Sequence, residues 1–131
     1  ANLGRYFIYG VTVLAPISGR VLRAANGYPD LPPGELRNDN VPGNHVIIRP
    51  DGLEVNILLA HLQNSSVLVK TGDRVTAGQP IGKVGSSGRT SEPHLHIHAQ
   101  KEMVKDGKSE WVGVPIRFGS RWLVRNSLVM T

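Results

Sequence analysis

The chain has 131 residues and no cysteine, and its lysines and arginines outnumber its aspartates and glutamates by 15 to 10. This length is typical of one domain with a core of its own, and the lack of cysteine excludes thiolate zinc ligands, thiol catalysis and disulfide bonds. The basic charge favours anionic partners. The positive charges are scattered and aromatic residues are few, so we expect no nucleic-acid binding. No apolar run approaches the ~20 residues of a membrane span.

Short apolar and β-branched runs, separated by glycine and proline, predict an all-β domain, a small sandwich or barrel with essentially no long helix. Pro50-Asp51-Gly52 predicts the turn of a hairpin, and Gly72–Gly82 is expected to form tight turns. The polar segment Tyr28–Pro42 contains four prolines, and the sequence leaves open whether it is a functional loop or a mobile connector. The expected strands are, in chain order, Val11–Ala15, Arg20–Ala24, Asn44–Arg49, Glu54–His61, Ser66–Val69, Gln79–Val84, His94–Gln100, Val114–Phe118 and Trp122–Val124.

Three of the five histidines, His94, His96 and His98, occupy alternate positions in one expected strand. Side chains along a strand alternate between two faces, so these three imidazoles share a face. Imidazole is the commonest metal ligand and the usual acid or base near neutral pH. A polar strand face with solvated histidines is the alternative, and three histidines in register favour a metal or acid-base site over it.

His61 lies in a different expected strand from those three histidines. Strict alternation puts it on the same face as Ile57 and Leu59. At that position a half-buried histidine with a satisfied hydrogen bond is the alternative to a functional role.

Five motifs between Val11 and Gln100 occur in the order found in one known family. They are Val13-Leu14-Ala15-Pro16-x-x-Gly19-x-Val21, Gly43-Asn44-His45-Val46-x-Ile48, Ala60-His61-Leu62, Val69-x-x-Gly72-Asp73-x-Val75-x-x-Gly78-Gln79-x-Ile81-Gly82, and Gly85-Ser86-Ser87-Gly88-Arg89-Thr90-x-x-Pro93-His94-Leu95-His96. With these motifs the chain resembles the lysostaphin-type zinc metalloendopeptidases, which cut peptide cross-links in bacterial cell walls. The resemblance implies their fold, the duplicated hybrid motif, which is a small, mostly antiparallel β-sandwich with a substrate groove across one sheet.

The resemblance also implies roles for three histidines. His96 would be a zinc ligand, His94 would point at the reacting carbonyl, and His61 would be its partner in moving protons and steadying the oxyanion. Zinc acidifies its bound water and polarises the scissile carbonyl. A cell-wall peptide substrate and an extracytoplasmic location, periplasmic or secreted, follow from the same resemblance.

The match breaks at the start of the chain. The family takes its other two zinc ligands from a His-x-x-x-Asp pair just before the first strand, and residues 1–10 contain neither His nor Asp. Either the pair lies upstream of Ala1 in the native protein, or the site has decayed and the chain binds wall peptides or a protein partner without cleaving them. His45 and His98 are extra imidazoles that form a candidate additional site. We therefore expect zinc to be absent or weakly held.

We expect one peptidase-like domain over residues 1–131, with residues 1–10 as a truncated start and residues 101–131 as a C-terminal extension packing on the core. A carrier or phosphotransfer domain, which shares glycine-rich turns, is the least favoured alternative. Such a domain needs two histidines from separate strands, whereas His94-Leu95-His96 comes from one.

Overall fold

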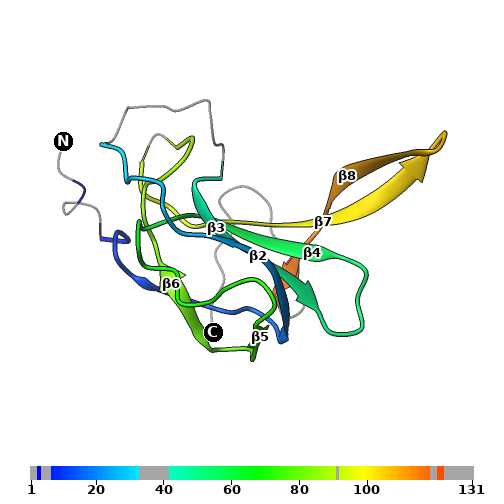
Figure 1. Cartoon of the computed structure of the whole chain (residues 1–131), viewed down its shortest axis with the longest axis horizontal. Helices are drawn as coiled ribbons and strands as arrows, with labels where there is room; N and C mark the ends of the chain where they lie inside the picture. Colours follow the sequence, from blue (N-terminus) through cyan, green and yellow to red (C-terminus); the bar gives the residue numbers. More distant parts are fainter. Residues whose placement is uncertain (1–2, 4–6, 33–41, 91, 119–120, 123–131) are drawn as a thin grey trace.

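The computed structural model describes residues 3, 7–32, 42–90, 92–118 and 121–122. The strands are β1 (Thr12–Leu14), β2 (Gly19–Ala25), β3 (Asn44–Pro50), β4 (Asn56–Leu62), β5 (Arg74–Val75), β6 (Pro80–Lys83), β7 (His96–Lys105), β8 (Lys108–Val114), β9 (Arg117–Phe118) and β10 (Arg121–Trp122). This all-β architecture confirms the predicted fold class (Figure 1). No helix in the described part of the chain has the length and hydropathy needed to cross a membrane.

A six-stranded antiparallel sheet of order β5-β2-β3-β4-β7-β8 forms the main layer, and β1 and β6 pair separately. Along β3, Val46 and Ile48 are fully buried while Ile47 and Arg49 are only partly buried. The buried set packs with Leu59 of β4 and with β1 and β6 side chains in one hydrophobic core. The core therefore lies between the main sheet and the β1–β6 pair, which covers only one face of that sheet.

We call the opposite side of the main sheet the outer face. Alternation and cross-strand register place on it, among others, Arg20, Ile47, Arg49, Leu58, Ala60, His96, His98 and Gln100. The predicted turn at Pro50-Asp51-Gly52 does join β3 to β4 as an antiparallel hairpin. The outer face is the surface on which the candidate site is built.

Several expected strands differ from the observed ones. Ser66–Val69 is not a strand, because Ser65 has a positive φ of 65° and the Ser66 N–H donates to Gln63 O in a turn. Strands β5 and β8 were not expected. Of the segments Tyr28–Pro42 and Trp122–Val124, residues 33–41 and 123–124 lie outside the described residues.

Strand β8 forms because the chain reverses at Asp106-Gly107. These two residues have φ of 54° and 74° and link the paired residues Lys105 and Lys108. Positive φ at both central positions defines the type I′ hairpin turn, for which Asp-Gly is a strong signal. The resulting β7–β8 hairpin projects from one end of the molecule with exposed side chains (Figure 1).

Replacing Gly43 with alanine should strongly destabilise the fold. Gly43 has φ of 59°, and an added Cβ would lie 2.4 Å from the Ser87 carbonyl carbon. Backbone strain and overpacking together should lower the free energy of unfolding by about 3 kcal/mol or more, measured by urea unfolding. Gly27→Ala is the control, since a Cβ there meets nothing within 4 Å; similar losses in both variants would contradict the prediction.

Candidate metal and catalytic site

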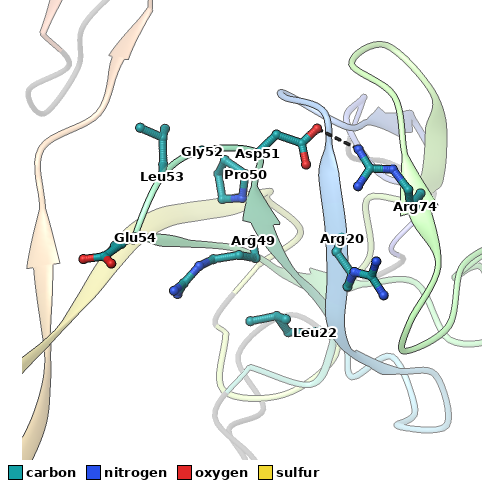
Figure 2. A pocket seen from close by; sticks show the side chains of 9 residues that line it. All are labelled: Arg20, Leu22, Arg49, Pro50, Asp51, Gly52, Leu53, Glu54 and Arg74. Atoms are coloured by element: carbon teal, nitrogen blue, oxygen red, sulfur yellow. Dashed lines mark hydrogen bonds and ion pairs between the residues drawn. The ribbon is translucent and has the colours of Figure 1, made fainter.

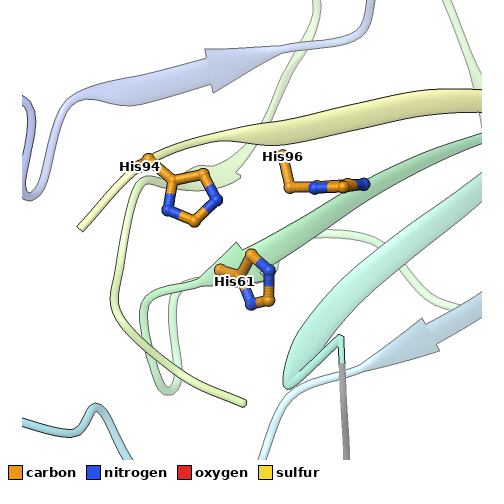
Figure 3. A group of neighbouring side chains, drawn as sticks. All are labelled: His61, His94 and His96. Carbon is orange, nitrogen blue, oxygen red and sulfur yellow. The ribbon is translucent and has the colours of Figure 1, made fainter. Parts of the chain in front are cut away.

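Three imidazoles meet at one end of the outer face (Figure 3). His61 comes from β4, His96 begins β7, and His94 precedes it by two residues. The ring centroids are 5.0 Å apart for His61 and His94, 5.7 Å for His61 and His96, and 6.4 Å for His94 and His96. One ring nitrogen from each lies within 4.8 Å of the other two. This spacing allows all three nitrogens to face a single ion or reacting group.

A β-bulge brings His61 into this cluster. In the β3–β4 register, Asn44 pairs with Leu62 but Val46 pairs with Leu59, so one extra β4 residue is accommodated. His61 itself has φ of 61°, a left-handed conformation in which histidine is found more often than most residues. The expectation that His61 shares the face of Leu59 is therefore wrong, since the bulge turns it to the outer face and gives the buried position to Leu62.

A small cavity lies beside the rings. It has a volume of about 260 Å³ and is lined by Pro42, Leu58, Ala60, His61, His96 and His98. Ala60 and Leu58 are the direct cross-strand partners of His96 and His98. Three histidines therefore face a mostly apolar hollow in which a bound chain segment would be partly shielded from water.

His61 and His94 each direct one ring nitrogen away from the cluster. His61 Nδ1 lies 2.8 Å from the Ser87 carbonyl oxygen, and His94 Nδ1 lies 3.0 Å from that of Glu92. A carbonyl oxygen only accepts, so both Nδ1 atoms are the protonated donors of the neutral rings. Each ring then presents an unprotonated Nε2, the arrangement that metal-ligating and proton-accepting histidines need.

His96 is held in a different way. Its Nε2 lies 2.7 Å from His98 Nδ1, and His98 Nε2 lies 3.4 Å from Gln100 Oε1. The amide oxygen of Gln100 accepts, so His98 Nε2 donates to it and His98 Nδ1 accepts from His96 Nε2. In this chain of hydrogen bonds, His96 keeps its lone pair on Nδ1.

Two residues outside the histidine set support His61. The Ser87 hydroxyl donates to the Leu62 carbonyl at 2.6 Å and accepts the Asn44 N–H at 3.0 Å, and Asn44 is fully buried. These bonds fix the segment whose carbonyl orients the His61 ring. Both residues lie within the family motifs, but the sequence alone does not indicate this supporting role.

The two extra imidazoles have different surroundings. His98 contacts His96, with ring centroids 5.0 Å apart. His45 is only 2% exposed, and its Nδ1 donates to the Gly43 carbonyl at 2.8 Å. The structure therefore joins His98 to the cluster and does not bring His45 into the group of three rings that could hold a metal.

Burial keeps two of the clustered rings neutral. Burial lowers the pKa of His61, and the neighbouring His94 and His96 lower it further, although the hydrogen bond to Ser87 opposes this. Burial likewise lowers the pKa of His96, with His98 and His94 adding to the effect. Near neutral pH both rings therefore keep a free lone pair, as a ligand or a base requires.

His45 should make the fold sensitive to acid. Burial lowers the pKa of His45 in the folded state. As pH falls, the unfolded chain therefore binds a proton at this histidine before the folded protein does, near the ordinary histidine pKa of ~6.5. The stabilisation is complete above that pH and is lost as pH falls through the folded pKa.

In urea unfolding at pH 7.5 and 5.5, the wild type should lose more stability than His45→Asn, by roughly 1 kcal/mol per unit of pKa difference. Asparagine keeps an N–H donor for Gly43 but does not titrate, and His61 and His96 contribute equally to both proteins. Equal losses would contradict a buried, neutral His45.

Comparisons with known proteins agree with this fold and identify the family. The family model of Peptidase family M23 matches residues 7–109. The chain is 38% identical over 87 residues to peptidoglycan DD-endopeptidase ShyC of Vibrio cholerae, covering 66% of this chain and 18% of that protein. It is 40% identical over 50 residues to murein hydrolase activator EnvC of Escherichia coli, covering 38% of this chain and 12% of that protein.

Among solved structures, the catalytic domain of lysostaphin from Staphylococcus simulans superposes with a TM-score of 0.58 and 27% identity, over 81% of this chain and 70% of that one. The chain therefore belongs to peptidase family M23. It spans about a fifth of the length of ShyC.

Proposed function

We propose that this domain hydrolyses peptide bonds in bacterial peptidoglycan with the help of zinc, and that it acts outside the cytoplasm. The observation that carries the proposal is the convergence of His61, His94 and His96 within 4.8 Å, at the positions where the family resemblance places its catalytic and metal-binding residues. The similarity to ShyC, a peptidoglycan DD-endopeptidase, supports the substrate class.

The nitrogen donors of these histidines suit a zinc ion, and His96 is the one ligand assigned among the described residues. Zinc binds histidine nitrogen, and its ligating histidines usually donate their other N–H to a carbonyl or similar acceptor. His96 would hold the metal through Nδ1, because its Nε2 is bonded to His98. The metal would polarise the scissile carbonyl and acidify a bound water.

His61 and His94 move protons in this proposal. Their Nδ1 atoms are fixed by carbonyl oxygens, so each neutral ring can accept a proton at Nε2 from the attacking water and return it to the leaving amine. The ring that carries the proton can then donate a hydrogen bond to the oxyanion. The apolar lining from Leu58 and Ala60 limits access of bulk water to the same point.

Digestion of purified peptidoglycan tests this function. Zinc-loaded protein should release soluble fragments with new peptide amino termini, and a chelator should stop the release. Zinc-loaded protein that binds peptidoglycan without releasing fragments would refute the proposal.

That negative result is the one expected from a second candidate function, a non-catalytic regulator. It is favoured by the similarity to EnvC, a murein hydrolase activator. A regulator of this kind would bind peptidoglycan or a hydrolase equally well with and without zinc.

A further inference from the structure

Three arginines stand side by side on the outer face, away from the histidines. Arg20 of β2 is the direct cross-strand partner of Arg49 on β3 and of Arg74 on β5. Neighbouring strands are only about 4.8 Å apart, and like charges directly opposite one another destabilise a sheet. Three cations in register therefore repel one another and destabilise the sheet, so the row needs an explanation other than stability.

The positive charge of the arginine row is only partly neutralised within the protein. Arg74 donates to the Asp51 carboxylate at 2.7 Å (Figure 2). Arg49 donates instead to the neutral amide oxygen of Asn56, at 3.1 Å. Arg20, in the middle of the row, has no acidic partner among the residues that the structure describes. Two further carboxylates, Glu54 and Glu102, line a hollow together with Arg49, and they share it with Lys101.

The row lines a hollow. A cavity of about 470 Å³ is bounded by the three arginines, the Pro50–Leu53 turn and the side chains of Leu22 and Glu54. The guanidinium group is planar and presents paired N–H donors that match a carboxylate or phosphate. The hollow thus combines room for a ligand group with cationic donors suited to an anion.

The hollow and the histidine cluster share one surface. On β3, His45 lies beside the bulge that carries His61, and Arg49 is four residues further along the same face, about 13 Å away. Ile47 and Leu58, a directly opposed and partly buried pair, lie between the two regions. An extended chain of about six residues could reach from one to the other.

We propose that Arg20, Arg49 and Arg74 form a subsite for a carboxylate of the peptide that lies along the outer face. The anion-binding chemistry stands on the arginine row alone, and the assignment to a wall peptide rests on the proposed function. Arg20 is the principal ligand because it lacks a carboxylate partner. Arg49 and Arg74 flank it as secondary donors.

The test measures binding by calorimetry and needs no turnover. The probe is a soluble cross-linked wall peptide with free carboxylates, and Arg20→Gln should raise its Kd about tenfold or more. Arg20→Lys, which keeps the charge but loses the fork, should fall between Arg20→Gln and wild type. Lys83→Gln removes one exposed cation from β6, which pairs with β1 outside the main sheet, and its Kd should stay within twofold of wild type.

Two further arms separate the alternatives. The same peptide with amidated carboxylates should bind wild type as weakly as the free peptide binds Arg20→Gln. Thermal unfolding should show that Arg20→Gln is as stable as wild type or more so, because repulsion in the row is relieved. Weaker peptide binding together with unchanged or higher stability is not expected from an arginine with a merely structural role.

The proposal is overturned if Arg20→Gln binds the peptide within twofold of wild type. It is also overturned if a phosphate-containing wall polymer, but not the peptide, shows the dependence on Arg20. Hydrolysis by wild type with no effect of Arg20→Gln on Kd would refute the subsite alone. If the wild type does not hydrolyse peptidoglycan but its peptide binding still depends on Arg20, only the proposed function is refuted.

Discussion

Replacing His94 with alanine should reduce peptidoglycan hydrolysis by about a thousandfold while leaving zinc affinity within about threefold of wild type. A positioned acid or base contributes a factor of roughly 10² to 10⁴ to the rate. His94 has the geometry for that role, since its ring lies 5.0 Å from His61 and its Nδ1 is fixed by the Glu92 carbonyl.

Two measurements on the same protein separate catalysis from metal binding. Hydrolysis is followed by the release of new amino termini, and zinc affinity by competition with a chromophoric chelator. Thr90→Val is the matched control. The Thr90 hydroxyl also contacts His94 Nδ1, at 3.0 Å, and its replacement removes this contact but keeps the His94 ring. We expect a smaller loss of rate, of about tenfold or less, from this change in orientation.

Two outcomes of the hydrolysis and zinc-affinity measurements would contradict the prediction. If His94→Ala loses zinc along with activity, His94 is a metal ligand together with His96. Full activity in His94→Ala would remove this residue from the mechanism.

The sequence could predict the class of fold because the determinants are local. Alternating burial on β3, with Val46 and Ile48 inside and Arg49 outside, follows directly from the residue pattern. The turn at Pro50-Asp51-Gly52 is a local signal of the same kind. Asp106-Gly107 is an equally strong local turn signal, and it accounts for the β7–β8 hairpin.

The direction of His61 could not be predicted in this way. It depends on a single extra residue in the β3–β4 register, and one such shift moves a side chain to the other face of the sheet. Local alternation placed His96 and His98 correctly on one face, because β7 is regular from its first residue.

Features that depend on register across strands were also invisible in the sequence. Arg20, Arg49 and Arg74 are far apart along the chain and become neighbours only when β5, β2 and β3 pair. The support that Asn44 and Ser87 give to His61 likewise requires the folded loops.

Replacing His96 with alanine should reduce zinc affinity at least a hundredfold. Zinc affinity comes from several deprotonated ligands presented together, and the hydrogen bond from His96 Nε2 to His98 leaves Nδ1 as the donor to the metal. Because few ligands are present, we expect even the wild type to hold zinc weakly, and the variant to show no measurable binding in the chelator competition.

His98→Ala gives the sharper test of how His96 is prepared. Partners that orient a metal-ligating histidine typically change affinity by 10- to 100-fold, so this variant should weaken zinc binding by about that factor. His45→Asn, outside the cluster, should leave it unchanged. In the metal-free protein, long-range proton–nitrogen NMR should find His96 protonated at Nε2 in wild type. Protonation at Nδ1, or undiminished zinc binding in His96→Ala, would show that the metal is held by other atoms.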